Sequence, residues 1–137
     1  MTGMLRRAMV GRTMAAPYLL EVATVPKYAI LFSLTSDALA RFIENPEDRR
    51  AAVSRLAEAA GGRLESYYWM FGQYDGLTIA ECPDSATAAA LALSAASSGA
   101  LKHFETHELI ASDDLVGILQ RAKTLRPSYR PPGQAGG

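Results

Sequence analysis

The apolar residues of this chain fall into short runs whose spacing alternates between that of strands and that of helices. Four runs are rich in aromatic and β-branched side chains, as is typical of strands: residues 27–34, 64–71, 77–82 and 101–110. The stretches between the first and second runs and between the third and fourth, and the one after the last, carry apolar residues at helical spacing. The pattern predicts the element order β-α-β-β-α-β followed by a terminal helix. This order is the ferredoxin-like plan of an α+β domain with a four-stranded antiparallel sheet.

Each predicted helix begins where polar residues can cap its first turn. Two of these starts, at residues 35–36 and 45–48, lie between the first two strands, and the others lie at residues 83–85 and 112–114. In the second of them we predict Asn45 as the cap and Pro46 as the first helical residue, because the amide hydrogen that proline lacks would be unpaired there. Gly61-Gly62 is predicted to end this helix, since glycine readily adopts the conformation that follows a helix.

The predicted sheet has one face without a cover. The helices pack on one side, and strand alternation places Leu77 and Ile79, with Tyr68 or Trp69, on the other. A sheet face of apolar side chains is rarely left in water. We therefore expect a homodimer that pairs the two sheets face to face, which is the arrangement of a dimeric α/β barrel.

A short connection, residues 71–76, joins the second and third predicted strands. It places Tyr74 and Asp75 between Gly72 and Gly76. Asp-Gly between two apolar runs predicts a β-hairpin, because glycine tolerates positive φ and aspartate accepts hydrogen bonds from turn amides. Two interpretations follow. Either Asp75 holds the turn while Tyr74 packs over it, or both line the mouth of a ligand pocket, Tyr74 as a donor and Asp75 as an acceptor or base.

Two histidines flank a glutamate in the fourth predicted strand. His103, Glu105 and His107 alternate and therefore share one face of the sheet, although the sequence leaves open which face. The α-carbons of the two histidines lie about 13 Å apart on a strand, so one ion between both is not expected. A metal would need a further ligand such as Glu81, and we predict no metal site. Two interpretations remain, a hydrogen-bonded His-Glu-His ladder and a histidine general base in a pocket.

Composition narrows the class of protein. The chain has 137 residues, enough for one domain with a core, and its 14 basic residues balance its 14 acidic ones. This neutrality argues against a nucleic-acid-binding protein. Cys82 is the only cysteine, so we expect no disulfide within the chain and a buried apolar role for Cys82 in a reducing cytoplasm. No apolar run reaches the ~20 residues that cross a membrane, and no motif predicts a cofactor.

Several short motifs resemble those of the GYD domain family. They are Pro26-Lys27-Tyr28, Gly72-Gln73-Tyr74-Asp75, Pro83-Asp84, Ser98-Gly99-Ala100 and Tyr129-Arg130-Pro131-Pro132-Gly133. The resemblance implies a small bacterial or archaeal protein with the dimeric ferredoxin-like barrel, in a family largely without assigned function. The Gly-x-Tyr-Asp hairpin is also similar to one in the effector-binding domain of leucine-responsive regulators. That similarity implies a ligand pocket near the turn, between subunits, although this chain lacks the helix-turn-helix of such regulators.

The resemblance divides the chain into three parts. Members of the family usually begin with Met-Pro-Lys-Tyr, where this chain has Val25-Pro26-Lys27-Tyr28. We therefore expect residues 1–24 to be a disordered leader or a misassigned start, with translation beginning at residue 25. Residues 25–124 are predicted to form the ferredoxin-like GYD domain. Residues 125–137 are predicted to form a tail rich in proline and glycine, without regular structure.

The sequence favours a homodimer that binds a small organic ligand in a pocket between the two sheets. The residues expected at this pocket are Tyr68, Trp69, Gly72, Tyr74 and Asp75. A first alternative is a cofactor-independent oxygenase or isomerase of the dimeric-barrel type, with His103, His107 or Asp75 as the catalytic base. A second alternative is a structural module that binds a partner protein through its sheet edge. No nucleic-acid or membrane partner is expected.

Overall fold

The structure, a computed structural model, describes residues 25–134. Its strands are β2 (Lys27–Leu34), β3 (Arg63–Trp69), β4 (Gly76–Glu81) and β5 (Leu101–Leu109). Its helices are α1 (Ser36–Glu44), α2 (Arg50–Ala59), α3 (Ser85–Ala96), α4 (Ser112–Leu125) and the 3-10 turn η1 (Arg126–Ser128). The predicted leader, residues 1–24, lies outside the described residues.

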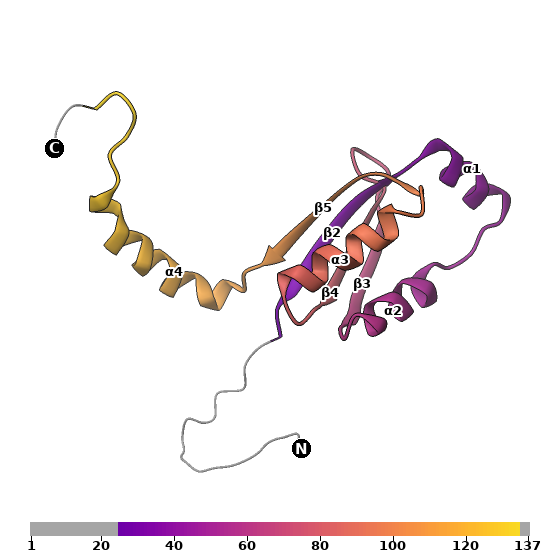
Figure 1. The fold of residues 1–137 in the computed structure, drawn as a ribbon, viewed down its shortest axis with the longest axis horizontal. Helices are drawn as coiled ribbons and strands as arrows, with labels where there is room; N and C mark the ends of the chain where they lie inside the picture. The colour runs from indigo at the N-terminus through magenta and orange to yellow at the C-terminus, as the bar shows by residue number, and fades with distance from the viewer. Residues whose placement is uncertain (1–24, 135–137) are drawn as a thin grey trace, which may run out of the picture.

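The four strands form one antiparallel sheet in the order β3-β4-β2-β5 (Figure 1). The central strands β2 and β4 are neighbours although two helices and β3 separate them in the chain. Helices α2 and α3 lie against one face of the sheet (Figure 1). This is the ferredoxin-like arrangement, so the predicted α+β fold class is confirmed.

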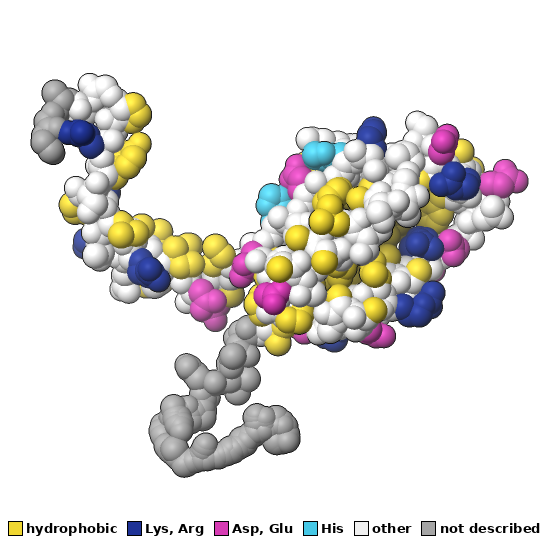
Figure 2. Space-filling model, viewed as in Figure 1, with side chains coloured by type: hydrophobic (Ala, Val, Ile, Leu, Met, Phe, Trp, Pro, Cys, Tyr) yellow, Lys and Arg dark blue, Asp and Glu magenta, His cyan; other side chains and the backbone are white. Residues whose placement is uncertain are grey.

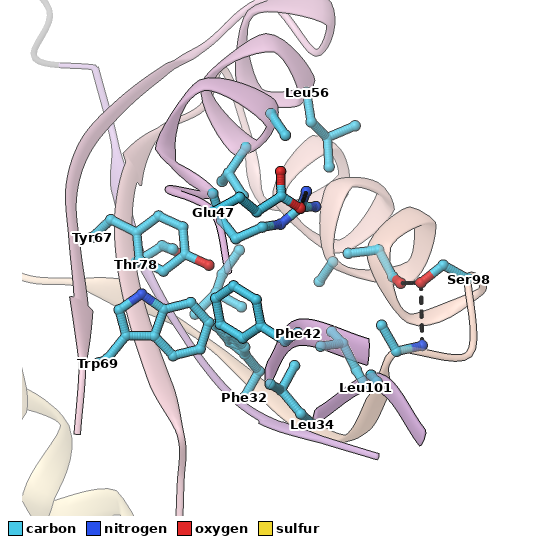
Figure 3. Close-up of a pocket in the computed structure, with 18 of the residues that line it drawn as sticks. Phe32, Leu34, Phe42, Glu47, Leu56, Tyr67, Trp69, Thr78, Ser98 and Leu101 are labelled. Atoms are coloured by element: carbon cyan, nitrogen blue, oxygen red, sulfur yellow. Dashed lines mark hydrogen bonds and ion pairs between the residues drawn. The ribbon is translucent and has the colours of Figure 1, made fainter. Parts of the chain in front are cut away.

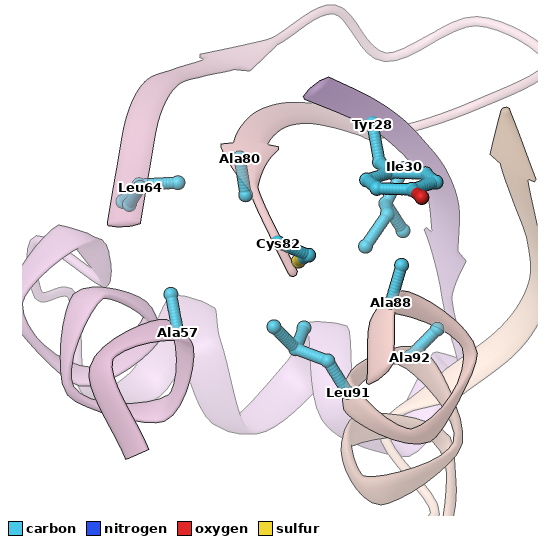
Figure 4. Packing of buried hydrophobic residues seen from close by; sticks show 9 residues of the cluster. All are labelled: Tyr28, Ile30, Ala57, Leu64, Ala80, Cys82, Ala88, Leu91 and Ala92. Carbon is cyan, nitrogen blue, oxygen red and sulfur yellow. The ribbon is translucent and has the colours of Figure 1, made fainter. Parts of the chain in front are cut away.

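The core lies between this face of the sheet and helices α2 and α3 (Figure 4). Its buried side chains come from alternate strand positions and from the inner sides of the helices: Tyr28, Ile30, Ala57, Leu64, Ala80, Cys82, Ala88, Leu91 and Ala92. The small side chains of the alanines allow both helices to lie close to the sheet. Cys82 is fully buried, as predicted, and burial raises the pKa of its thiol, which keeps the thiol protonated and unreactive.

Helix α2 begins later than predicted. Asn45 is the C-cap of α1, and its amide donates to the Arg41 carbonyl at 2.9 Å. A residue before proline is disfavoured in the helical conformation, so the chain leaves the helix ahead of Pro46. The carboxylate of Asp48 accepts the Arg50 amide at 2.9 Å at the start of α2. The prediction of Asn45 as the cap and Pro46 as the first residue of this helix is therefore wrong.

The β3–β4 connection is a hairpin, as predicted, but its tip lies before Asp75-Gly76. The Met70 amide donates to the Asp75 carbonyl at 2.9 Å, and these two residues close the loop. Within the loop it is Phe71 that has a positive φ, 39°. Gly76 is already the first residue of β4 and is needed for a different reason. A Cβ at Gly76 would lie 2.4 Å from the ring of Phe32.

Helix α4 buries none of its residues in the part of the chain that the structure describes. It continues from the end of β5 and points away from the sheet and the other helices (Figure 1). Its apolar side chains recur at helical spacing and are exposed, Val116 by 62% and Leu119 by 56%. Figure 2 shows hydrophobic side chains along this helix. An amphipathic helix draws most of its stability from packing its apolar face, so this helix lacks a partner surface in the described chain.

The predicted tail begins with regular structure. Helix α4 extends to Leu125, and η1 adds a 3-10 turn over Arg126–Ser128, so the first residues of the tail are helical. Residues 129–134 contain no further helix or strand. Within residues 25–134, none of the helices combines the length and the apolar character that a membrane span requires.

Candidate functional site

The side of the sheet opposite α2 and α3, here called the open face, carries two adjoining surfaces. The first is apolar. In the strand register Leu77 pairs with both Leu31 and Tyr68, so these three side chains form one row across the sheet. Ala29 and Ile79 form the next row. Tyr68 is 61% exposed, and Leu77 and Ile79 are half-buried, which confirms that they lie on the face without helices.

The second surface of the open face is polar and follows the edge strand β5. Glu105 pairs with Leu31 of β2 and therefore lies beside the apolar row. His103 and His107 stand two residues before and after Glu105, so all three side chains share the open face. The sequence did not determine which face carries these three residues, and the structure places them on the open face.

Tyr74 joins this polar surface from the hairpin. Its hydroxyl donates to Glu105 Oε2, and its ring stacks on that of His103 with centroids 5.8 Å apart. Nε2 of His107 lies 2.9 Å from Glu105 Oε1, and Nε2 of His103 lies 3.3 Å from Oε2. The predicted His-Glu-His ladder is present, with the Tyr74 hydroxyl as a third partner. We call these four side chains the Glu105 cluster.

Hydrogen bonds set the protonation of the Glu105 cluster. The Tyr74 hydroxyl, followed by the two imidazoles, favours the carboxylate and lowers the pKa of Glu105 from 4.5 to about 2. The same hydrogen bond raises the pKa of Tyr74, because an ionised phenol would bring a second negative charge beside Glu105. At neutral pH Glu105 is therefore a fixed anion that orients two imidazoles and a phenol on the open face.

Removing the Tyr74 hydroxyl should raise the pKa of Glu105. Tyr74→Phe deletes the partner with the largest effect and keeps the ring that stacks on His103. The carbon-13 shift of the Glu105 carboxyl during acid titration should have its midpoint at about 2 in the wild type and higher in the variant. Because the folded-state pKa is depressed, the contribution of the Glu105 cluster to stability is complete above 4.5 and is lost as the pH falls toward about 2.

Tyr68→Phe is the matched control for this titration. It removes a hydroxyl from the same face of the sheet, but Tyr68 is not among the groups that shift the pKa of Glu105. Its midpoint should equal that of the wild type. A Tyr74→Phe titration that coincides with the wild type would contradict the hydrogen bond.

Asp75 ties the hairpin to the end of β2. Its Oδ2 accepts the Leu34 amide at 2.8 Å, and its own amide donates to the Phe32 carbonyl at 2.8 Å. The β2–β5 register shifts between Ser33 and Leu34, so the carboxylate supplies an acceptor where the ladder is irregular. These contacts fit the interpretation in which Asp75 holds the turn.

Asp75→Ala should lower the free energy of unfolding by about 1–3 kcal/mol, because the partly buried Leu34 amide loses its acceptor. In a domain of this size the melting temperature should fall by roughly 5–15 °C. Asp75→Asn keeps a side-chain oxygen that can accept from the Leu34 amide, so its free energy of unfolding should fall much less. Glu44→Ala removes an exposed carboxylate from the end of α1 and should leave the melting temperature unchanged. Equal melting of Asp75→Ala and the wild type in a thermal scan would refute this role.

The family of the chain follows from comparison with known proteins. Residues 28–119, from the start of the sheet into α4, match the family described as GYD domain. The chain belongs to the GYD domain family. The resemblance seen in the sequence motifs is thereby confirmed.

One relative of this GYD protein comes from Thermus thermophilus. It is described as a glutamine synthetase and cystathionine beta-lyase binding protein and is 32% identical over 96 residues, which make up 70% of this chain and 100% of the relative. This identity over the full length of the relative supports the family assignment.

Two solved structures are similar to parts of this chain. A transcriptional regulator of Neisseria meningitidis in complex with L-Met has 17% identity and a TM-score of 0.46 over 81% of this chain and 63% of that chain. A Nitrosomonas europaea protein of unknown function has 21% identity and a TM-score of 0.36 over 64% of this chain and 91% of that chain.

The residues expected at one pocket of the GYD protein lie on two faces of the sheet. Tyr68 and Tyr74 are on the open face, and Gly72 is exposed in the hairpin loop beside them. Trp69 alternates with Tyr68 and lies on the helix-covered face, where its ring is 5.7 Å from that of Phe32. Tyr68 and Trp69 of one chain therefore cannot line the same side of the sheet.

The helix-covered face of the GYD protein contains a cavity of about 520 Å³ that our reading of the sequence missed (Figure 3). Trp69, Tyr67 and Phe42 are among its lining residues. The alternation of residues 67–69 was the available signal, since it puts Tyr67 and Trp69 on the face opposite Tyr68. That α1 leaves space above these rings is a tertiary feature without a sequence motif.

Among residues 25–134, no group of three or more His, Cys, Asp or Glu side chains is arranged to hold a metal ion. The Glu105 cluster supplies hydrogen-bond donors and acceptors. Glu105 accepts from Tyr74 and contacts both histidines, so its oxygens are engaged within the chain. This arrangement can orient a polar group of a ligand next to the apolar rows.

Proposed function

We propose that this GYD protein is a homodimer that pairs two open faces and binds a small organic ligand between them. The observation that carries the proposal is the apolar surface of the open face, formed by Leu31, Leu77, Ile79 and Tyr68, which no helix of the described chain covers. Apolar surface of this kind is stabilised by burial at an interface.

A second copy of the chain is the occupant that fits both exposed apolar surfaces. A two-fold axis lets the open face of each chain cover that of its partner, because such an interface uses the same surface twice. Helix α4 continues from β5, the strand that carries the Glu105 cluster, so in the dimer it reaches over the partner. The apolar stripe of α4, including Val116 and Leu119, then packs against the partner and is no longer exposed to solvent.

The ligand site lies where the apolar rows meet the Glu105 cluster. Ligand sites combine a largely apolar lining with a few fixed polar groups, and these two adjoining surfaces supply both. Tyr68 and Leu77 contribute the apolar part, and Tyr74 with Glu105 contributes the polar part. Gly72 and Asp75 belong to the hairpin that positions Tyr74.

Native mass spectrometry of the purified protein tests both parts of the proposal. The expected mass is twice that of the 14.7 kDa chain plus the mass of a retained organic molecule. A single-chain mass at micromolar concentration would overturn the proposal. A dimer without any retained molecule, which also binds none from a library of small organic acids and amides, would overturn the ligand part alone.

A second candidate function is binding of a metabolic enzyme, and it rests on the Thermus thermophilus relative, whose description names two bound enzymes. The exposed stripe of α4 is the surface that such a partner would contact. Mixing the protein with glutamine synthetase of the same organism and measuring the mass of the eluting species by light scattering tests it. Coelution that Leu119→Asp abolishes would support enzyme binding, and separate elution would refute it for this enzyme.

A further inference from the structure

The helix-covered face of the sheet contains a cavity of about 520 Å³ that opens to solvent and is lined by all four strands and by helices α1, α2 and α3. It is distinct from the Glu105 cluster, which lies on the open face. Pockets that bury small organic ligands measure about 300–1,000 Å³, so the space suits such a ligand.

One wall of the cavity is aromatic, with the Trp69 indole at its centre (Figure 3). The rings of Tyr67 and Phe71 both stack on that of Trp69, at 5.3 and 5.9 Å and inclined by 29° and 14°. The ring of Phe42 from α1 lies 5.4 Å from Trp69. Aromatic clusters of this kind attract flat rings through edge-to-face contacts. The wall therefore favours a ligand with a flat aromatic body.

Two hydroxyls interrupt this apolar lining. The Tyr67 hydroxyl points into the cavity, and Thr78 lies beside it (Figure 3). Burial raises the pKa of Tyr67 to about 12, so at neutral pH its hydroxyl is protonated and can donate a hydrogen bond. Thr78 is almost fully buried. A polar atom on the ligand can accept a hydrogen bond from the Tyr67 hydroxyl.

The charged residues that line the cavity leave an excess of positive charge. They are Arg41, Glu47 and Arg49, all near the connection between α1 and α2. Arg49 is paired with Glu47, with Nη1 and Oε2 3.1 Å apart. Arg41 takes part in no ion pair within residues 25–134 and is exposed to solvent. A guanidinium binds a carboxylate through two parallel hydrogen bonds, so Arg41 favours an anionic group on the ligand.

From these three features we infer that the cavity is a binding site for a small aromatic carboxylate. The ring system lies against Trp69 and Phe42, and the carboxylate pairs with the Arg41 guanidinium. The Tyr67 hydroxyl donates to a polar atom on the ligand. This inference is separate from the homodimer and its ligand site, since it concerns the other face of the sheet and residues of a single chain.

Trp69 makes the inference directly measurable, because it is the only tryptophan of the chain. Its indole N–H gives a single resonance in a nitrogen-15 correlation spectrum, and that resonance reports on the aromatic wall. Titration with 2-naphthoate should shift the resonance to saturation. 2-Naphthamide has the same shape without the charge. Its affinity should be about tenfold lower than that of 2-naphthoate, because it cannot form the charge-assisted hydrogen bonds.

Two arginine variants separate the contribution of Arg41 from a general effect of charge. Arg41→Ala should reduce the affinity for 2-naphthoate to that for 2-naphthamide. Arg55→Ala removes an exposed arginine from α2 that does not line the cavity, and it should leave the affinity unchanged. Both side chains are exposed, so both variants should keep the far-ultraviolet circular dichroism and melting temperature of the wild type.

The inference is overturned if 2-naphthoate leaves the Trp69 resonance in place. It is also overturned if the acid and the amide bind equally, or if Arg41→Ala binds 2-naphthoate as tightly as the wild type does. A single-chain mass in solution combined with an intact titration would overturn the homodimer and support this site. A dimer in which 2-naphthoate leaves the Trp69 resonance unchanged would support the homodimer and overturn this site. The two failures are therefore distinguishable.

Discussion

Leu77→Asp should convert the proposed GYD dimer to monomers. Leu77 occupies the middle of the apolar row, between Leu31 and Tyr68, and is half-buried already in the single chain. In the proposed dimer the second sheet would remove the remaining water from this position. A carboxylate without a partner in such an interface costs several kcal/mol. The dimer dissociation constant should therefore rise by about a thousandfold or more, which corresponds to about 4 kcal/mol.

Multi-angle light scattering over a range of protein concentrations measures this change. Leu93→Asp is the matched control, because it makes the same substitution at a leucine of α3 that is 58% exposed on the helix-covered side. Its mass should remain that of the wild type. Circular dichroism should show both variants folded, since neither position belongs to the buried core. A Leu77→Asp protein that stays dimeric at low micromolar concentration would show that the open face is not the interface.

Most of the fold could be predicted from the sequence, because local patterns determine it. The four apolar runs are bounded by caps and glycines, and their order permits few sheet topologies. The uncovered face could also be predicted, since alternation in residues 77–81 separates Leu77 and Ile79 from Thr78 and Ala80. These features depend on residues close in sequence and on the period of two in a strand.

The predicted start of α2 and the predicted position of the hairpin turn are wrong because two valid local rules compete at each place. Asn45 can cap a helix that starts or end one that stops, and Pro46 is compatible with both. The structure uses Asn45 to end α1, with its amide bonded to Arg41. Asp75-Gly76 likewise predicts a turn, yet Gly76 is in the strand because the ring of Phe32 occupies the place of its missing side chain. Which rule prevails is decided by packing.

Only part of the candidate site could be predicted, because the rest depends on packing between distant segments. Alternation correctly grouped His103, Glu105 and His107, and the structure adds Tyr74 to them through contacts between the hairpin and β5. No spacing rule connects Tyr74 with Glu105, because 31 residues separate them. The cavity beside Trp69 is still less visible in the sequence, since it depends on how far α1 stands from the sheet.

Gly62→Ala should destabilise the protein more than any other glycine substitution considered. A Cβ at Gly62 would lie 2.0 Å from the carbonyl oxygen of Glu81 and 3.1 Å from its carbonyl carbon. These are backbone atoms at the end of β4, and they cannot move aside without disturbing Cys82, which is fully buried next in the chain. Overpacking of this kind costs about 3 kcal/mol. The melting temperature should fall by roughly 10–20 °C.

Neighbouring glycines show whether this loss comes from the contact or from backbone conformation. Gly61 has a φ of 81° and its added Cβ would lie 3.7 Å from Pro83 Cγ, so Gly61→Ala tests the left-handed conformation alone and should cost about 1 kcal/mol. Gly72 has no atom within 4 Å of an added Cβ, and Gly72→Ala should melt with the wild type. Thermal unfolding of the three variants should follow the order Gly72, Gly61, Gly62 from least to most destabilised. If Gly61→Ala loses as much stability as Gly62→Ala, the close approach of β4 is not the cause, and backbone conformation at the end of α2 explains both.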